Sequence, residues 1–458
     1  MVKLQAAAKI IQTPQSKKPA QADTRDTGTQ ADLFSDQELF GVKKGEFIKK
    51  SRNRVLADIE ELAKNNRWND ILSLYHPVDD KQPDLVRAGA DIPVRQKIAF
   101  ALGQTGAFDD AIKELLVCVR AEPDNFMSRT SLAYTAYNSL YAAKNKKIFL
   151  AGEARTQRIA LAHEHFKKAQ DLRPDGITNF YRQGMLFSQI ENKPGPGLEK
   201  FDIACFNWEH LTDEKKAERQ QEKKNYVKSL YRSASLLLAS GNGIKALERI
   251  TACLKQDEQT HYISLAFKYF ALGKVQFCMD HYDEAKSALL FALQSSNRND
   301  STDFIHELLA RTYLAMGKTD KAVETIGGVP EKFRRPYYRW TEADVLCTAG
   351  RFEQAKTILT AAAARDSRSR HISLIRLAKI EYTLKNYTQA MEHAAKACDF
   401  FTGNWGNPYL EGLFWQSLCA FKAGQPQKAD QLLTELERHS RFYPNLDRLR
   451  AMIRHSDD

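Results

Sequence analysis

The sequence predicts an all-α protein, a solenoid or α-α superhelix of about nine or ten helical hairpins. Three observations lead to this fold class. Apolar residues recur at the spacing of one helix face over successive segments, and polar breaks separate the segments. A short pattern of small and apolar residues repeats along the chain, and a turn-forming residue precedes most copies at a constant distance. No alternating run of β-branched residues is long enough to indicate a strand.

The repeated pattern is a small residue, an apolar residue four positions later, and a small or apolar residue three positions after that. Its nine copies are Ala111/Leu115/Cys118, Ala162/Phe166/Ala169, Gly197/Phe201/Ala204, Ala246/Ile250/Cys253, Ala285/Leu289/Ala292, Ala322/Ile326/Val329, Ala355/Leu359/Ala362, Ala390/Ala394/Ala397 and Ala429/Leu433/Leu436. Their first members are 51, 35, 49, 39, 37, 33, 35 and 39 residues apart. This spacing places one copy in the second helix of each hairpin, where a small side chain lets two helices approach closely.

A second signal stands five residues before each small residue. The residues there are Gly106, Gln157, Asn192, Gly241, Asp280, Gly317, Gly350, Lys385 and Gly424. Seven of the nine are Gly, Asn or Asp, the types that tolerate the left-handed conformation at a helix end. These positions therefore predict the tight turn that closes each hairpin.

These residues resemble the tetratricopeptide repeat, a helical hairpin of about 34 residues. The clearest copies are Leu272-Gly273 with Tyr282, Ala285, Leu289 and Ala292, then Leu309-Ala310 with Tyr313, Gly317 and Ala322, and then Gly350, Phe352, Ala355, Leu359 and Ala362. Two copies also carry the closing proline, Pro123 and Pro174. The resemblance extends over about 95–440. It implies stacked hairpins whose first helices line a concave groove.

The rest of the chain divides around this array. Residues 1–41 are rich in polar residues and predict a flexible tail, and 42–94 predict a basic, degenerate capping hairpin with Lys49, Lys50, Arg52 and Arg54. The array at 95–440 is expected to carry insertions near 140–156 and 209–224, where the intervals are longest. The highly charged second insertion predicts an extended exposed helix. Residues 441–458 predict a C-terminal capping helix and tail.

Composition limits the function classes. The formal net charge is +11 and the pI is about 9.1, which permits acidic proteins, nucleic acid or anionic surfaces as partners. The seven cysteines form no Cys-x-x-Cys pair and predict free, buried thiols. The sequence shows neither a signal-peptide pattern nor an apolar run long enough to span a membrane, so we expect a cytoplasmic protein.

The residues carry no catalytic or metal-binding motif, and we expect no enzyme activity, cofactor or metal. His306-Glu307 starts like a zinc-protease motif, but Ala310 stands where its second histidine would be. His163 and His165 are two residues apart in a predicted helix and point to different faces. No phosphate-binding loop and no nucleophile elbow occur.

The predicted groove would present aromatic and cationic side chains. The candidates are Arg182, Tyr231, Phe270, Lys274, Arg311, Trp340, Arg376, Lys379 and Tyr382, with Lys228, Glu307 and Asp344 among them. Arg and Lys pair with carboxylates, and Trp and Tyr supply rigid contact area. The alternative is that some of these side chains belong to the core between repeats and the others to ordinary surface. The Lys/Asn pair that clamps C-terminal carboxylates in some family members is absent.

The leading hypothesis for function is therefore a non-catalytic scaffold or adaptor that binds a protein or peptide in this groove, with acidic or aromatic-bearing segments favoured. Two alternatives stand beside it. One is a nucleic-acid-binding repeat protein that uses its basic surface. The other is a regulatory subunit of an enzyme whose catalytic site is on another chain. The partner, pathway and oligomeric state do not follow from the sequence.

Overall fold

The computed structural model describes residues 44–297 and 300–454. The predicted tail at 1–41 lies outside these residues, as do 455–458 of the predicted C-terminal tail. All regular elements in the described part are helices, and it contains no β-strand. The predicted fold class, an all-α solenoid of helical hairpins, is confirmed. The chain divides into two compact units, Met1–Cys118 and Val119–Asp458.

The described part of the first unit holds six helices, the last of which continues three residues past its boundary as far as Ala121. They are α1 (Lys44–Lys64), α2 (Trp68–Tyr75), α3 (Val78–Lys81), α4 (Pro83–Arg87), α5 (Ile92–Thr105) and α6 (Phe108–Ala121). Both α1 and α2 pack on α5. Arg95 of α5 is 2% exposed, and its guanidinium binds Asp79 at 2.5 Å, Glu114 at 2.6 Å and also Asp91. This buried cation thus links α3, α5 and α6.

The second unit holds eight consecutive hairpins and a final single helix. The first four hairpins are α7 (Phe126–Lys144) with α8 (Gly152–Leu172), α9 (Thr178–Met185) and a π-helical turn (Leu186–Glu191) with α10 (Pro194–Glu209), α12 (Gln220–Ala239) with α13 (Gly243–Gln256), and α14 (Leu265–Cys278) with α15 (Tyr282–Gln294). The next four are α16 (Asp303–Ala315) with α17 (Thr319–Gly327), α18 (Pro336–Thr348) with α19 (Phe352–Arg365), α20 (Arg370–Thr383) with α21 (Tyr387–Trp405), and α22 (Leu410–Lys422) with α23 (Pro426–His439). A short helix, α11 (Asp213–Glu218), precedes α12, a 3-10 turn (Glu331–Phe333) precedes α18, and α24 (Leu446–Arg454) closes the unit.

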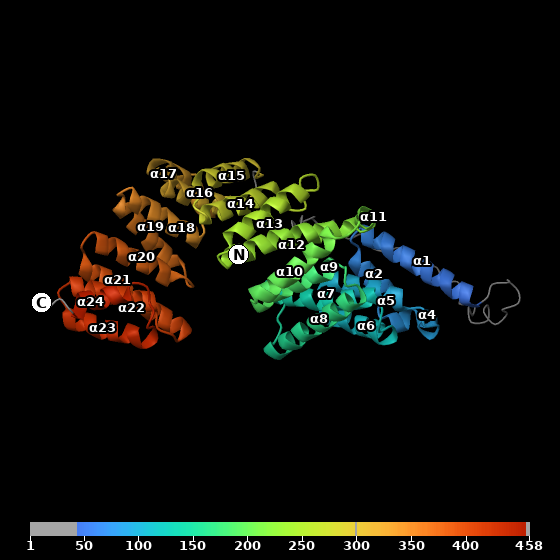
Figure 1. Cartoon of the computed structure of the whole chain (residues 1–458). Coiled ribbons are helices and arrows are strands. Elements are labelled where there is room, and N and C mark those ends of the chain that lie inside the picture. The colour runs from blue at the N-terminus through green and yellow to red at the C-terminus, as the bar shows by residue number, and fades with distance from the viewer. Residues whose placement is uncertain (1–43, 298–299, 455–458) are drawn as a thin grey trace, which may run out of the picture. The chain divides into compact units, whose positions relative to one another are not determined.

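The packing within the second unit repeats from hairpin to hairpin. Each second helix contacts its own first helix and the first helix of the next hairpin. Neighbouring first helices also contact one another from α12 to α22 (Figure 1). We call the side that these helices share the first-helix face. It is formed by α7, α9, α12, α14, α16, α18, α20 and α22.

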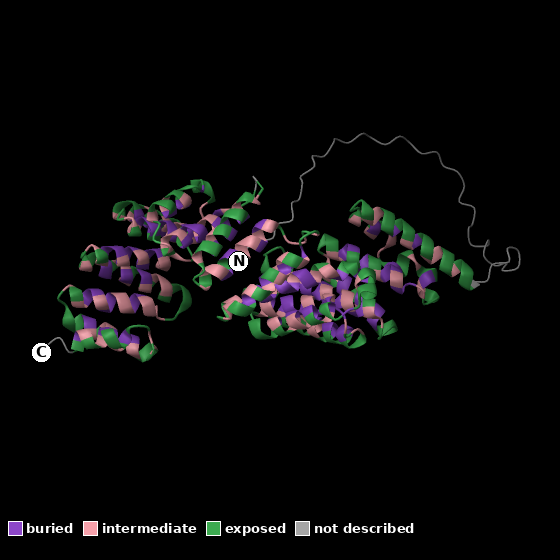
Figure 2. Ribbon diagram, turned by 45° about the horizontal axis from the view of Figure 1, so that its top comes forward, coloured by how far each residue is buried: buried purple, intermediate pink, exposed green. Residues whose placement is uncertain are grey.

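Burial follows the repeated pattern of the sequence. The nine small residues that begin the pattern are all buried, from Ala111 to Ala429. Eight of the nine apolar residues four positions later have no more than 1% of their surface exposed, and Ile326 has 2%. Figure 2 shows the result as buried stripes along helices whose other sides are exposed. The small side chains therefore lie where the helices are closest, as the spacing predicts.

The turns also follow the sequence, with one exception. Eight of the nine predicted turn residues have positive φ, including Lys385 at 65°. Gln157 does not, because it lies inside α8, which begins earlier at Gly152. The left-handed residue of that hairpin is Lys146, with φ 57°. The turn prediction at Gln157 is wrong because the extra residues of this repeat lengthen the helices and move the turn toward the N-terminus.

The region of the second predicted insertion is mostly exposed, as its charge pattern suggests, but two of its charged side chains, Arg219 and Glu222, are buried. The chain does not form one extended exposed helix there, because α11 ends at Glu218 and α12 starts two residues later. Arg219 at the break is 6% exposed. Its guanidinium binds Asp175 at 2.9 Å and Glu222 at 2.5 Å. Part of this charged run is therefore fixed to the residues before α9 by a half-buried ion pair with Asp175.

Gly273 marks the closest approach of two helices in the repeat that most resembles the tetratricopeptide pattern. A Cβ atom there would lie 2.8 Å from Leu289 Cγ and 3.2 Å from the Ala285 carbonyl oxygen. We expect Gly273→Ala to lower the free energy of unfolding by about 1–2 kcal/mol, since overpacking outweighs the gain in helix propensity. The matched control is Gly403→Ala, where no atom lies within 4 Å. A urea titration in which both variants gain stability would contradict the assigned packing.

Candidate interaction site on the first-helix face

A hollow of about 520 Å³ opens on the first-helix face between α14 and α20. The hairpin packing explains its position. Each first helix buries one side against second helices, and the side chains on its other side meet those of the next first helix. The hollow is lined by Phe277, Glu307, Arg311, Leu314, Tyr337, Trp340, Thr341, Asp344 and Arg376. Five of these lie at positions that the sequence predicts for the groove, and the structure brings them together: Glu307, Arg311, Trp340, Asp344 and Arg376.

On one side of the hollow, Arg311 is held by an aromatic ring and a carboxylate. Its guanidinium carbon lies 5.0 Å from the centroid of the Phe277 ring. Its Nη1 lies 3.6 Å from Oε1 of Glu307, one helical turn earlier. The same oxygen accepts a hydrogen bond of 2.7 Å from the Thr341 hydroxyl. Arg311 is exposed, so a ligand can reach its remaining N–H groups.

On the other side, Arg376 and Trp340 are held in a similar way. Arg376 Nε lies 3.2 Å from Asp344 Oδ1, and its guanidinium carbon lies 5.6 Å from the centroid of the Trp340 ring. The indole N–H of Trp340 donates a hydrogen bond of 2.9 Å to the Ser373 hydroxyl. The indole is therefore fixed before any ligand binds, which lowers the entropy cost of binding.

The charges of the hollow balance. Two guanidinium groups face two carboxylates, Glu307 and Asp344. Tyr337 adds a phenol that donates a hydrogen bond of 2.6 Å to Asp303. Burial and this carboxylate raise the pKa of Tyr337, so its hydroxyl stays protonated. The hollow therefore combines aromatic surface with both donors and acceptors, and it carries no large net charge of its own.

The other candidates from the sequence lie outside this hollow. Lys379 and Tyr382 face α22: Lys379 binds Glu411 at 2.8 Å, and both lie beside Trp415. Phe270 packs edge-on against Phe304, with 4.6 Å between centroids, in the core between hairpins.

Four candidates remain, at the N-terminal half of the face and on α14; one of them, Lys228, is partly buried on α12. Tyr231 also packs against a hydrophobic core. Lys274 is exposed on α14. Arg182 lies on α9 over the ring of Tyr134, and its guanidinium carbon is 3.6 Å from the centroid.

The sequence reasoning missed several residues of this face. Phe277, Leu314 and Tyr337 line the hollow, yet they were not among the candidates. Each stands three residues from a candidate or its neighbour on the same helix, as Phe277 does from Lys274 and Tyr337 from Trp340. A search for exposed residues at this spacing would have found them, because such pairs share a helix face.

The buried thiols are poor nucleophiles. Burial raises the pKa of Cys118, Cys253 and Cys419 to about 12. They are therefore uncharged at neutral pH and pack as small apolar residues. His163 binds Glu191 at 2.6 Å, whereas His165 contacts Arg129. In residues 44–297 and 300–454, no group of three or more His, Cys, Asp or Glu side chains is placed to hold a metal ion.

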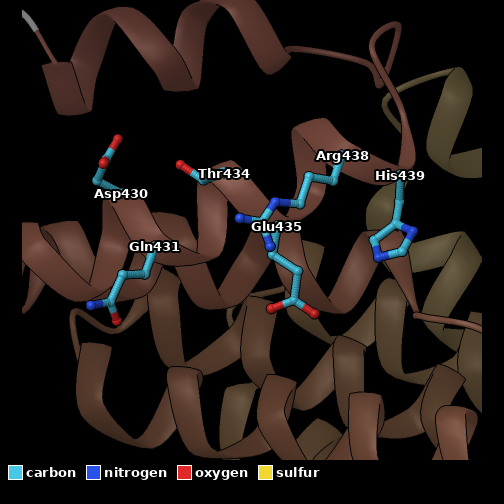
Figure 3. A pocket seen from close by; sticks show the side chains of 6 residues that line it. All are labelled: Asp430, Gln431, Thr434, Glu435, Arg438 and His439. Atoms are coloured by element: carbon cyan, nitrogen blue, oxygen red, sulfur yellow. The ribbon is translucent and has the colours of Figure 1, made fainter.

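A second hollow, of about 440 Å³, lies on α23. Figure 3 shows its six lining side chains, which are Asp430, Gln431, Thr434, Glu435, Arg438 and His439. All come from one helix. Asp430 already binds Arg454 of α24 at 2.7 Å. We assign no binding role to this hollow and use it below as a control surface.

The basic cluster of the sequence lies on α1. Lys49, Lys50 and Arg54 are exposed there. The same helix carries Asp58 and Glu60 further along, and Glu60 binds Lys97 at 2.9 Å. The basic cluster thus lies in the first half of α1, and the last turn of the helix carries one more cation, Lys64. None of the described helices is long and apolar enough to span a membrane.

The fold and its packing define a helical-repeat protein. Residues 203–370 match the family model described as "Tetratricopeptide repeat-like domain". The predicted resemblance to the tetratricopeptide repeat is therefore confirmed, and the family model covers residues 203–370 of the array. No curated protein matches the chain.

Solved structures of tetratricopeptide proteins are similar to the chain at low identity. A tetratricopeptide repeat protein from Parabacteroides merdae is 14% identical, with a TM-score of 0.42, over 64% of this chain and 98% of that one. Yeast Tom70 is 12% identical, with a TM-score of 0.37, over 89% of this chain and 96% of that one. At these scores the likenesses say nothing about partners.

Proposed function

We propose that this protein is a non-catalytic scaffold that binds a segment of a partner protein on the first-helix face, with the hollow between α14 and α20 as the anchoring point. The hollow is the observation that carries the proposal. Its indole and guanidinium groups are held in place by neighbouring hairpins and remain open to solvent. Aromatic and arginine side chains in such settings dominate binding energy at protein interfaces.

The chemistry of the hollow indicates what it would accept. Trp340 and Phe277 offer flat apolar surface, and the two arginines keep free N–H donors beside carboxylate acceptors. A partner segment can therefore insert one aromatic or long apolar side chain while its backbone amide groups pair with the rim. Because the charges balance, this hollow selects less for an acidic ligand than for an apolar anchor with a hydrogen-bonding backbone.

The test compares two double variants in affinity captures from a lysate of the source organism. We expect Trp340→Ala/Arg376→Gln to lose specific partners that the wild type retains, with at least a tenfold loss of affinity for a purified one. The control is Gln431→Ala/Arg438→Gln on α23, which should retain them. Identical partner sets for all three proteins would refute the anchoring role of the hollow.

A further inference from the structure

The N-terminal half of the first-helix face in the second unit gathers cations that lack carboxylate partners. Arg182 of α9 and Lys228 and Arg232 of α12 form no ion pair with any residue of the described chain, 44–297 and 300–454. This contrasts with the hollow, where Arg311 and Arg376 each bind a carboxylate. The negative charge of Glu222 favours the charged form of Arg182, but this carboxylate already forms an ion pair with Arg219 at 2.5 Å.

Tyrosines surround these cations. The guanidinium carbon of Arg182 lies over the Tyr134 ring, 3.6 Å from its centroid. Tyr134, Tyr137 and Tyr141 form a row along α7, with successive ring centroids 6.4 and 6.2 Å apart. Burial raises the pKa of Tyr181, and the positive charges of Arg232 and Arg182 oppose this rise. Tyr181 therefore links α9 to α12 in this cluster. We call these side chains the Tyr–Arg cluster.

The cluster is held in an electrostatically costly state. Burial lowers the pKa of Arg182 and of Lys228, and nearby Lys224 and Arg232 lower that of Lys228 further. Burial also raises the pKa of Tyr181 and Tyr137, so these tyrosines stay neutral and supply no negative charge. Positive charge is thus partly removed from water without a counter-charge. An anionic ligand would supply that counter-charge and form charge-assisted hydrogen bonds.

We propose that the Tyr–Arg cluster binds an acidic segment of a partner protein, whose carboxylates pair with Arg182, Lys228 and Arg232 while its chain lies against the tyrosine row. This rests on the proposed scaffold function but uses other hairpins than the hollow. Charge complementarity selects the acidic ligand. The tyrosine row favours a peptide, because the accessible parts of Tyr134 and Tyr141 offer phenol surface to apolar side chains and backbone, while Tyr137 between them is buried.

The geometry also sets a spacing for the acidic residues. Packed helices lie about 8–10 Å apart, and an extended chain advances about 3.3 Å per residue. Carboxylates three residues apart can therefore meet Arg182 on α9 and the pair on α12. Lys228 and Arg232 are one turn apart on α12 and can share one carboxylate or take two.

The experiment uses a fluorescein-labelled peptide with glutamate at every third position and phenylalanine and glycine between. A control peptide has the same sequence with glutamine in place of each glutamate. We expect fluorescence anisotropy to show wild-type binding of the glutamate peptide, at least tenfold weaker binding of the glutamine peptide, and weakening by added salt. Arg182→Gln/Arg232→Gln should lose at least tenfold in affinity for the glutamate peptide. The single variant Lys228→Gln should also weaken binding of the glutamate peptide. Because it removes only one partly exposed charge, its effect cannot be attributed to a folding defect in the double variant.

Two controls separate this proposal from its alternatives. Lys321→Gln/Lys428→Gln removes two charges from exposed positions on the second helices α17 and α23 and should bind as the wild type does. Trp340→Ala/Arg376→Gln should also bind normally, so failure of the hollow and failure of the cluster are distinguishable. Absence of binding, equal loss in the lysine control, or tighter cluster-dependent binding of a short oligothymidine would overturn the proposal.

Discussion

Replacing Lys268 with methionine is expected to lower the free energy of unfolding by roughly 3–5 kcal/mol, since it leaves an uncompensated charge in the core. Lys268 of α14 and Asp257 at the end of α13 are both 0% exposed. The ammonium nitrogen lies 2.8 Å from Oδ2 of Asp257 and 3.1 Å from its carbonyl oxygen. Without the lysine, the carboxylate would keep its burial and lose its counter-charge.

The surroundings of Asp257 explain why the carboxylate cannot simply become neutral at little cost. Burial alone would raise its pKa, but hydrogen bonds from Lys268, the Ile263 and Tyr262 amides and the Thr260 hydroxyl hold that pKa below its usual range. Oδ1 accepts from Thr260 at 2.7 Å and from the Tyr262 amide at 2.7 Å. These donors favour the charged form and fix the loop between α13 and α14.

A double variant isolates the charge. Lys268→Met/Asp257→Asn keeps an acceptor for the loop and removes the buried charge, so we expect it to recover part of the lost stability. Urea titration followed by circular dichroism gives the total change. Amide hydrogen exchange should show that the loss of stability is concentrated in α13 to α15, because stability in repeat arrays is mostly local. A loss below about 1 kcal/mol in the single variant would contradict the assigned pairing.

The fold is predictable because close helix packing and tight turns each require their own residue types, at separate positions in the sequence. A small residue such as Ala285 is needed where helices meet, and a residue that tolerates positive φ, such as Asp280, is needed where they turn. Residue type does not identify every turn, since Lys385 has a φ of 65° although lysine does not favour this conformation. Gln157 shows the limit of a fixed spacing, because lengthened helices moved the turn to Lys146.

The candidate site was less predictable, because helical periodicity places residues on one helix but does not say which neighbours meet across helices. The sequence predicts Arg311, Trp340 and Arg376 as first-helix residues, and the hollow does join them. Phe270 has the same periodicity but packs into the core against Phe304. The absence of counter-charges around Arg182 is likewise invisible in the sequence, where acidic residues are interleaved nearly everywhere.

The stability of the second unit is expected to fall with acidification in a way that depends on His165 of α8. This histidine is 3% exposed, and its Nδ1 lies 2.9 Å from Arg129 Nη1. Because guanidinium groups only donate, Nδ1 accepts this hydrogen bond and must be unprotonated. Burial, helped by the Arg129 charge and opposed by Glu164, lowers the pKa of His165 from 6.5 to about 4.

The sign follows from linkage. The folded state holds the proton less tightly than the unfolded state, so the contribution of His165 to stability is complete above pH 6.5 and is lost as the pH falls toward 4. A shift of this size corresponds to about 3 kcal/mol across that window. His165→Gln offers a carbonyl oxygen to Arg129 and cannot be protonated, so it should lack this part of the pH dependence.

The measurement is the difference between two titrations. We expect the urea stabilities of wild type and His165→Gln to converge as the pH is lowered from 7 to 4, while general acid effects cancel because they act on both proteins. Replacing the exposed His439 with glutamine should leave the wild-type slope unchanged. Hydrogen exchange in α7 and α8 should report the same loss locally, since the Arg129–His165 contact joins those two helices. Parallel curves for wild type and His165→Gln would show that folding does not lower the pKa of His165.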